Sequence, residues 1–412
     1  MQKIFDELNS LDKRCYEEFA LTEDILMEHA ANAMSLHIQE NYQDKKTILI
    51  VCGSGNNGAD GIALARLLYK KYKINLYLSS QLKSKMAILQ YKRVQLLGIN
   101  AIDTLEESDI VIDCIFGSGL NRALDKKSIE LIEQLNSFDS VKISCDIPSG
   151  INSKGQVEDN AFFADTTITM GALKTSLYTD VSKDYVGNVI VANLGLPREI
   201  YEVDTNKYLL EEKDIVLPFR NKKNTHKGSY GHLNVVVGCK KGAGIIAAKA
   251  AFGFGAGLVS VVSHEDLDLP YHIMQSRFLS GNCTAIAIGM GLGKYELNEV
   301  KEILSKDIPT IIDADLFYED VILDVLHKDV VLTPHPKEFC ALLKLCNIAD
   351  ISIDTLQANR FLYVEKFTNK YPNVILLLKG ANVIIANDKT MYINPLGSSI
   401  LSKVGSGGVL SG

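Results

Sequence analysis

Residues 53–61 combine the residue types and the spacing that most strongly suggest chemistry in this chain. They read Gly-Ser-Gly-Asn-Asn-Gly-Ala-Asp-Gly and so contain the pattern G-x-G-x-x-G. An apolar run ending at Cys52 predicts a strand before them, and helical spacing follows them. Backbone N–H groups and the helix dipole favour an anion at such a junction. The added Asn56, Asn57 and Asp60 indicate a more specialised site, and the alternative is an ordinary glycine-rich turn of a nucleotide-binding unit.

Two more acidic residues, Asp113 and Asp146, lie at the ends of predicted strands, and Ser149 follows the second. In parallel α/β sheets, ligands bind beyond the carboxyl ends of the strands. These oxygens would therefore face the glycine-rich loop. They could hold a hard cation, or combine a general acid–base group with a cation. The alternative is that both aspartates simply cap the turns that follow their strands.

The elements that must position these residues alternate between strand and helix. Alternation with apolar, buried strands predicts an α/β fold with a Rossmann-like, doubly wound parallel sheet. A helical segment over residues 1–42 is expected to pack on this sheet. The expected strands are 47–52, 74–78, 110–115 and 141–147, and the expected helices are 59–73, 83–97 and 127–136.

A charged and polar stretch near residue 205 predicts a boundary between two domains, 1–205 and 206–412. The second half again alternates apolar strands with helical segments. Most of its strand ends deliver Gly, Asp, His or Lys, which predicts a second α/β domain with a site of its own. Its expected strands are 232–238, 257–262, 285–288, 309–312, 330–332 and 374–378.

The composition is that of an ordinary globular protein, with 412 residues, 47% apolar and 23% charged. A net charge of −7 argues against nucleic acid as the main partner, because cations are needed to neutralise phosphates. A basic stretch containing Lys222, Lys223 and Lys227 is either a solvated linker or a contact for one small phosphate. The eight scattered cysteines form no zinc pattern, and we expect a cytoplasmic protein without a signal segment or a membrane partner.

Four motifs in the first half resemble the signatures of the NAD(P)HX epimerase domain: 53–61, 116–122, 146–150 and 169–174. That family interconverts the R and S epimers of hydrated nicotinamide cofactors. The resemblance implies that a potassium ion is bound by Asn57, Asp113 and Ser149, and that Asp146 contacts the substrate ring as the acid–base group. Gly53, Gly55 and Gly58 are expected to admit the substrate phosphates. The implied substrate-binding residues are Asn56, Asn57, Gly58, Ala59, Asp60, Gly117, Ser118, Gly119, Leu120, Asn121, Arg122, Ala123 and Asp146, of which Ala59 departs from the family's usual glycine.

Motifs of the second half resemble the ADP/ATP-dependent NAD(P)HX dehydratase domain, which is ribokinase-like. They lie at 242–244, 253–259, 289–293, 313–316, 333–338, 379–381 and 405–407. The resemblance implies that Ala243, Gly291 and His335 contact the hydrate, with His335 catalytic. ADP, or ATP, with Mg²⁺ would be held by Lys379, Gly380, Ala381, Asn382, Val383, Ser398, Gly405, Ser406 and Gly407. Both domains in this order resemble the family of bifunctional NAD(P)H-hydrate repair enzymes, with NADHX and NADPHX as substrates and a homo-oligomeric assembly expected.

Two departures bear on the second domain. The dehydratase family has a catalytic aspartate where this chain has Gly408, and glycine cannot accept the proton of the substrate hydroxyl. The chain also ends at Gly412, inside the first turn of an expected helix, so an incomplete and impaired dehydratase domain is expected. The alternatives are a ribokinase-like kinase of a small molecule and a non-catalytic binding or scaffold protein. The choices of ADP or ATP, and of NADHX or NADPHX, stay open.

Overall fold

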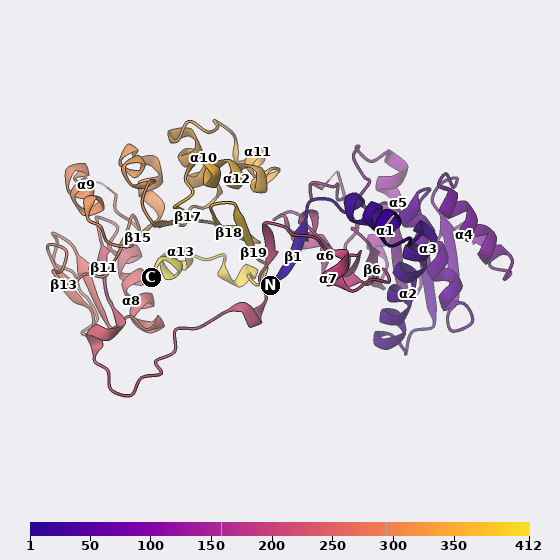
Figure 1. Cartoon of the computed structure of the whole chain (residues 1–412), viewed down its shortest axis with the longest axis horizontal. Helices are drawn as coiled ribbons and strands as arrows, with labels where there is room; N and C mark the ends of the chain where they lie inside the picture. The colour runs from indigo at the N-terminus through magenta and orange to yellow at the C-terminus, as the bar shows by residue number, and fades with distance from the viewer. Residues whose placement is uncertain (158, 294) are drawn as a thin grey trace. The chain divides into compact units, whose positions relative to one another are not determined.

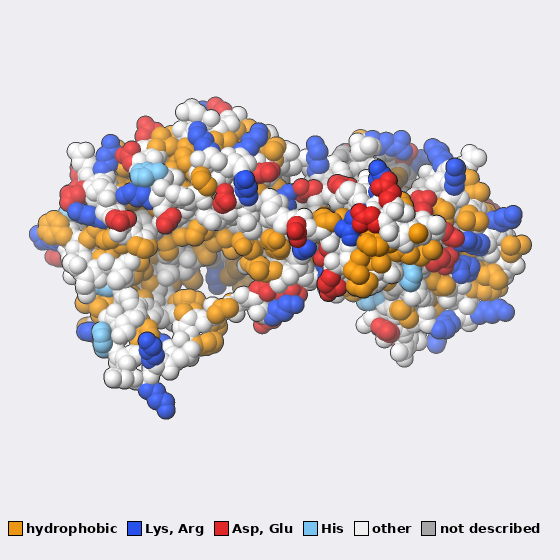
Figure 2. Space-filling model, viewed as in Figure 1, with side chains coloured by type: hydrophobic (Ala, Val, Ile, Leu, Met, Phe, Trp, Pro, Cys, Tyr) orange, Lys and Arg blue, Asp and Glu red, His pale blue; other side chains and the backbone are white. Residues whose placement is uncertain are grey.

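The computed structural model describes residues 1–157, 159–293 and 295–412. The chain divides into two compact units: an N-terminal unit of Gln2–Thr205 and a C-terminal unit of Asn206–Gly412 to which Met1 belongs. Both are α/β, as the alternation of strands and helices predicts (Figure 1). Acidic and basic side chains are intermixed over the visible face of each unit (Figure 2).

The N-terminal unit is built on a seven-stranded parallel sheet of order β4-β3-β2-β5-β6-β7-β9. Side chains of β2 alternate between two cores: Ile48 and Ile50 pack with α2, α3 and α4, whereas Leu49 and Val51 pack with α5. Helices therefore cover both faces, which confirms the doubly wound fold. The strands are β2 (Thr47–Cys52), β3 (Lys73–Leu78), β4 (Ala101–Ile102), β5 (Ile110–Cys114), β6 (Val141–Cys145), β7 (Thr166–Met170) and β9 (Asn188–Ala192), and the helices are α2 (Glu23–Asn41), α3 (Asn56–Leu68), α4 (Lys85–Gln95) and α5 (Lys126–Ser137).

The expectation of helix throughout residues 1–42 is wrong. The segment forms strand β1 (Gln2–Phe5), helix α1 (Asn9–Glu18) and then α2. β1 pairs in parallel with the short strand β8 (Leu173–Lys174), which satisfies its backbone groups outside a helix. α1 stops because Ala20 adopts a positive φ of 54° and the Leu21 N–H turns back to the Cys15 carbonyl. The unit also contains α6 (Lys183–Val186) and α7 (Arg198–Tyr201).

The C-terminal unit contains a mixed sheet with the order β13-β12-β11-β14-β15-β16-β17-β18-β19-β10. α8 (Lys241–Phe254) covers one face, and α9 (Leu297–Ser305), α10 (Pro336–Leu345) and α12 (Arg360–Lys370) cover the other (Figure 1). The strands are β10 (Lys207–Leu209), β11 (His232–Val236), β12 (Leu258–Val262), β13 (Met274–Ser276), β14 (Ala285–Ile288), β15 (Thr310–Ile312), β16 (Val330–Leu332), β17 (Ile375–Leu378), β18 (Val383–Asn387) and β19 (Thr390–Asn394).

An antiparallel meander, β17-β18-β19, closes one part of this sheet. The alternation of strands and helices in the sequence does not predict this meander, because its three strands follow one another without a helix between them. Its turn places Asp388 at a φ of 51°, a conformation that Asp tolerates. Two short helices, α11 (Ile353–Gln357) and α13 (Ser406–Ser411), complete the unit. Among the described residues, no helix is both long enough and apolar enough to cross a membrane.

Candidate active sites

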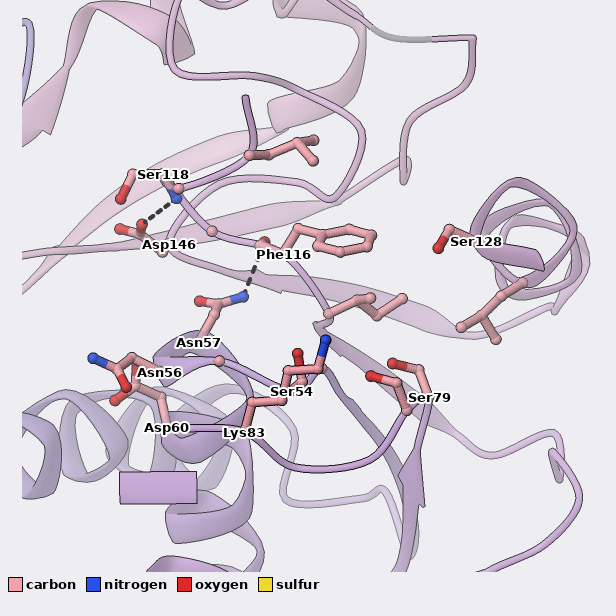
Figure 3. A pocket seen from close by; sticks show the side chains of 18 of the residues that line it. Ser54, Asn56, Asn57, Asp60, Ser79, Lys83, Phe116, Ser118, Ser128 and Asp146 are labelled. Carbon is pink, nitrogen blue, oxygen red and sulfur yellow. Dashed lines mark hydrogen bonds between the residues drawn. The ribbon is translucent and has the colours of Figure 1, made fainter. Parts of the chain in front are cut away.

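A cleft of about 1480 Å³ lies at the carboxyl ends of the strands of the N-terminal unit. Most of the predicted substrate-binding residues line it: Asn56, Asn57, Asp60, Gly117, Ser118, Gly119, Leu120, Asn121, Arg122 and Asp146. Figure 3 shows Asp146 and Ser118 close to Asn57 and Asp60, with Lys83 and Ser79 farther along the cleft. The remaining predicted residues, Gly58, Ala59 and Ala123, do not belong to the described wall of this cleft.

The glycines of residues 53–61 serve two different purposes. A Cβ atom on Gly53 would lie 1.9 Å from the Ile115 carbonyl oxygen, and one on Gly58 would lie 2.1 Å from the Gly53 oxygen. These two glycines therefore allow one backbone to approach another, and Gly58 does not open the loop to a phosphate. Gly55 and Gly119 have no neighbouring atom within 4 Å of a Cβ position, so they leave room for a ligand.

Asp146 is held at the inner end of the cleft by a positive φ of 72° and by three donors. The Lys174 ammonium lies 2.5 Å from its Oδ1, and the Met170 N–H donates to the same oxygen at 3.2 Å. The Ser118 N–H donates to Oδ2 at 3.2 Å, which ties the predicted phosphate loop to this carboxylate (Figure 3). Burial alone would raise the pKa of Asp146, but Lys174 and the backbone donors bring it below its usual range. This carboxylate is therefore held in its ionised form.

Lys174 is a functional candidate that was not predicted from the sequence. Its side chain is buried, and besides Asp146 it donates to the Thr169 hydroxyl at 2.7 Å. It stands 28 positions after Asp146, on β8, and no local pattern joins the two. Only the pairing of strand ends in three dimensions brings them together.

Two other carboxylates, Asp12 and Asp60, share the wall of the cleft with Asp146. Burial and the neighbouring charge of Asp146 raise the pKa of Asp60 well above its usual value. Burial also raises the pKa of Asp12, against the effect of a hydrogen bond from the Tyr201 hydroxyl. The site thus contains one stabilised carboxylate together with carboxyl groups that resist ionisation.

Two of the three predicted potassium ligands, Asn57 and Ser149, contact the backbone of Phe116, and the third, Asp113, contacts Ser149. Asp113 is fully buried and accepts hydrogen bonds from the Ser149 N–H at 2.7 Å and hydroxyl at 2.6 Å. The Asn57 side-chain amide donates to the Phe116 carbonyl at 3.0 Å, and the Ser149 hydroxyl lies 3.4 Å from the same oxygen. Burial raises the pKa of Asp113 to about 6, although Ser149 opposes that shift. Several oxygens thus converge on one small region, the type of donor set that a hard cation takes.

In the C-terminal unit, Asp313 follows β15 and forms a partly buried ion pair with Lys379 at 2.6 Å. The Ser411 hydroxyl donates to the other oxygen of Asp313 at 2.9 Å. A Cβ atom on Gly407 would lie 3.4 Å from the Lys379 ammonium nitrogen. The structure therefore brings the predicted nucleotide residues Lys379 and Gly407 together beside Asp313.

The predicted hydrate-contacting residues Ala243 and Gly291 are also neighbours. A Cβ atom on Gly291 would lie 3.1 Å from the Ala243 Cβ, and Gly291 has a φ of 68°. On the same side, a Cβ atom on Gly408 would lie 3.1 Å from the Ala243 carbonyl oxygen. Position 408, where the resemblance implies an aspartate, is thus beside the predicted hydrate residues.

His335 serves as the N-terminal cap of α10. Its Nδ1 accepts a hydrogen bond from the Glu338 N–H at 3.2 Å, and Glu338 accepts from the His335 N–H at 2.7 Å. Its Nε2 lies 3.2 Å from Glu338 Oε1, so both ring nitrogens face Glu338. Burial, followed by the charge of Lys379, lowers the pKa of His335. A local capping role is thus evident, and a catalytic role for His335 stays a prediction.

The other predicted nucleotide residues come from separate segments. Gly397, next to Ser398, lies near Ala381, since a Cβ on Gly397 would stand 3.7 Å from the Ala381 oxygen. Asn382 is buried, and Val383 begins β18. The nucleotide contacts of Gly380, Val383, Gly405 and Ser406 stay predictions.

Comparison with known proteins extends over both units. Residues 23–176 match the family model of the YjeF-related protein N-terminus, and residues 233–412 match that of NAD(P)H-hydrate dehydratase. The bifunctional NAD(P)H-hydrate repair enzyme Nnr of Helicobacter pylori is 43% identical, covering 100% of this chain and 90% of its own. The Nnr enzyme of Dictyoglomus turgidum is 33% identical, covering 99% and 87%. A solved ADP/ATP-dependent NAD(P)H-hydrate dehydratase from Bacillus subtilis, co-crystallised with ATP/Mg²⁺, is 26% identical with a TM-score of 0.39, covering 47% of this chain and 73% of its own.

Proposed function

This chain belongs to the family of bifunctional NAD(P)H-hydrate repair enzymes, and we propose that Asp146 is the acid–base residue with which its N-terminal unit epimerises the hydrate. The observation that carries this assignment is the ionised Asp146 carboxylate, held by Lys174 at the inner end of the cleft. Similarity along the full chain favours cofactor repair over the small-molecule kinase and scaffold alternatives.

Epimerisation requires that the hydroxyl leave the hydrated ring carbon and that water return to the opposite face. Asp146 acts in the second half of this exchange. Its ionised carboxylate accepts a proton from the incoming water as the new carbon–oxygen bond forms. Lys174 and the backbone donors keep this carboxylate in the correct ionisation state and orientation.

The substrate phosphates lie along the outer part of the cleft in this proposal. Gly55 and Gly119 leave open space there, and the N-terminus of α3 offers N–H groups that intrahelical bonds do not use. The exposed Arg122 supplies a guanidinium that suits phosphate oxygens. Asn56 and Asn57 then fix the position of the ring end of the substrate near Asp146.

A potassium ion suits the residues Asn57, Asp113 and Ser149, because each carries a side-chain oxygen; the Asp113 and Ser149 oxygens lie 2.6 Å apart, and the Asn57 oxygen lies beside Gly117. When bound, such an ion supplies a fixed positive charge that orders the phosphate-binding loop. Asp113 is fully buried and its pKa is raised to about 6, so a cation would also relieve the cost of its ionisation.

In the C-terminal unit we assign Lys379, beside Asp313, to the phosphates of ADP or ATP. The family relationship and the ATP/Mg²⁺ of the Bacillus subtilis dehydratase support nucleotide and Mg²⁺ use. Asp313 holds the Lys379 ammonium, and Ala243 and Gly291 border the space beside position 408. Gly408 removes the base that would take the hydroxyl proton of the hydrate, so we expect slow dehydration.

The test of the epimerase assignment uses the separated R and S hydrates of NADH without nucleotide. The intact protein should interconvert them faster than the spontaneous reaction, and Asp146→Ala should abolish the acceleration. Activity should also fall when potassium is replaced by tetramethylammonium. An Asp146→Ala variant that is folded and as fast as the unchanged protein would refute the assignment.

A further inference from the structure

Asp12 is a carboxylate of the catalytic cleft that neither the motifs nor the proposed mechanism uses. It lies on α1 and lines the same wall as Asp146 and Lys174. Residue 12 precedes the segment 23–176 that matches the family model, and Tyr201 follows it. The chain therefore brings a titratable group to the reaction site from outside the matched region.

The orientation of Asp12 depends on contacts from a distant part of the chain. The Tyr201 hydroxyl, at the end of α7, donates to Asp12 Oδ1 at 2.8 Å across a separation of 189 residues. Gly171, at a φ of 74°, makes room for the Tyr201 ring, because a Cβ atom there would lie 2.5 Å from it. Tyr201 is itself buried, at 2% exposure, so the hydrogen bond aims Asp12 from a fixed position.

Burial opposes the ionisation of Asp12 more than its polar and charged neighbours favour it. The groups whose charges interact with it are one ammonium, one phenol partner and several acidic groups: Lys174, Tyr201, Asp146, Asp60, Glu7, Cys15 and Tyr16. Burial raises the pKa of Asp12, and the Tyr201 hydrogen bond lowers it. The Lys174 ammonium also contacts Asp146 at 2.5 Å, and Asp146 is its stronger partner, so Asp12 only shares this positive charge.

The exchange of hydroxyl between the two faces of a ring needs both a proton donor and a proton acceptor. An ionised carboxylate held by an ammonium, as Asp146 is, accepts a proton but is a poor donor. A second carboxyl group with the opposite tendency supplies what is missing. Two titratable groups whose environments push their ionisation apart, in one cleft, are the arrangement that acid–base catalysis uses.

We propose that Asp12 is the second catalytic residue of the epimerase site, the acid that protonates the departing hydroxyl. This inference rests on the proposed function of the N-terminal unit. The Asp12 carboxylic acid gives its proton to the hydroxyl, the carbon–oxygen bond breaks, and water leaves as the ring nitrogen lone pair forms a carbon–nitrogen double bond. Water then adds to the opposite face, Asp146 takes one of its protons, and transfer of that proton back to Asp12 restores the starting state.

The competing role for Asp12 is structural. An acidic residue in the first turn of a helix interacts favourably with the helix dipole, and Asp12 occupies that turn of α1. Such a role affects folding but leaves the pH profile of the reaction unchanged. The experiment must therefore read the pH dependence as well as the rate.

The test compares Asp12→Asn, Tyr201→Phe and Asp146→Asn in the full chain, with Glu17→Gln as an exposed control on the same helix. The probes are the R and S hydrates of NADH, and kcat/KM is measured across pH. We expect Asp12→Asn to lose about 10²-fold in kcat/KM and to lose the fall in rate at high pH. Affinity for a non-reacting dinucleotide such as NAD⁺ should be unchanged, as should the rate of Glu17→Gln.

Tyr201→Phe keeps the acid but removes the hydrogen bond that favours its ionised form. Its high-pH limb should move to higher pH, which a purely structural Asp12 would not cause, even if Asp12→Asn folds poorly. Two results would overturn the role of Asp12 without affecting that of Asp146. One is a high-pH limb of the rate profile that does not move in Tyr201→Phe. The other is a folded Asp12→Asn variant with wild-type rates while Asp146→Asn is inactive. If Asp146→Asn is also fully active, the proposed function fails instead.

Discussion

The two units each place an aspartate after a parallel strand and pair it with a lysine, but they use the pair differently. Asp146 contacts Lys174 at 2.5 Å, and Asp313 contacts Lys379 at 2.6 Å. In the N-terminal unit the lysine is the buried partner, with 5% of its side chain exposed, whereas Lys379 is 22% exposed. The Asp146–Lys174 pair thus presents its carboxylate, whereas the Asp313–Lys379 pair presents its ammonium.

The remaining contacts agree with this contrast. Asp146 lines a cleft, and backbone N–H groups of Ser118 and Met170 reach it from two loops. Asp313 has its second oxygen covered by the Ser411 hydroxyl. In our proposal, the Asp–Lys pair of one unit serves proton transfer, and the pair of the other positions a phosphate-binding lysine. Position and exposure, more than residue type, decide the role.

The largest expected effect separates the two activities. Asp146→Asn removes the proton acceptor, so epimerisation should fall about 10²- to 10⁴-fold while nucleotide-dependent dehydration of the S hydrate is unchanged. Asp313→Asn should do the opposite, since it releases Lys379. The measurements are R-to-S conversion without nucleotide and recovery of reduced cofactor with nucleotide. Loss of both activities in either variant would contradict the separation.

A gain of function should follow from Gly408→Asp. A carboxylate at this position lies beside Ala243 and restores the missing base, so dehydration should rise by about 10²-fold or more. The closest contacts of the new Cβ, 3.1 Å to the Ala243 oxygen and 3.3 Å to Ile246, require only small shifts. Gly408→Asn is the matched control and should give no gain. Equal rates for Asp and Asn would show that the base is elsewhere.

Removing each lysine should affect stability unequally. Lys174→Met leaves the buried Asp146 carboxylate without its cation and should cost about 3–5 kcal/mol of unfolding free energy at neutral pH. Lys379→Met should cost only about 1–3 kcal/mol, because Lys379 is partly exposed and Ser411 still donates to Asp313.

Urea unfolding measured against pH shows in which direction the stability contributed by Asp146 changes with pH. The pKa of Asp146 is lowered in the folded protein, so its contribution to stability is present above the ordinary Asp pKa and is lost as pH falls through the lowered value. The deficit of Lys174→Met should therefore shrink in acid, where Asp146 protonates in the variant first. An equal loss of unfolding free energy in the two lysine variants at all pH values would contradict the difference between the two ion pairs.

The smallest effects concern the glycines next to each site. Gly53→Ala and Gly238→Ala put a Cβ 1.9 Å from the carbonyl oxygens of Ile115 and Leu292, and each should cost about 1–3 kcal/mol. Gly55→Ala and Gly242→Ala meet open space and should lose no more than about 0.5 kcal/mol. Gly55→Ala should instead raise the KM for the hydrate. Thermal unfolding and steady-state kinetics distinguish the glycines in close contact from those in open space. Equal destabilisation by all four substitutions would refute this distinction.

Much of the framework could be predicted from sequence because it depends on local signals. Apolar runs such as 47–52 and 110–115 mark buried parallel strands, and polar residues at their ends mark the edge where ligands bind. The resemblance of four motifs identified ten of the residues that line the cleft, but not Asp12 or Lys174. The cap formed by His335, Pro336 and Glu338 was not predicted, although Pro at the first helical position and Glu two residues later are helix-start signals.

The rest depends on contacts between distant residues, which local patterns do not encode. Lys174 was visible in a motif, but its partner Asp146 becomes apparent only when the ends of β6 and β8 meet. Asp12 and Tyr201 are 189 residues apart and belong to no recognised motif. The short strand β1 was taken for helix because its pairing with β8 lies outside any local window.

The most direct test of the central assignment follows the oxygen atom of the hydrate. The purified R hydrate is incubated with the protein in water enriched in heavy oxygen, without nucleotide, and both epimers are analysed by mass spectrometry. If Asp146 completes the addition of water to the ring carbon, label should enter the S hydrate at the enzymatic rate, and Asp146→Asn should show only the spontaneous rate. A folded Asp146→Asn variant that forms labelled S hydrate as fast as the unchanged protein would contradict the account.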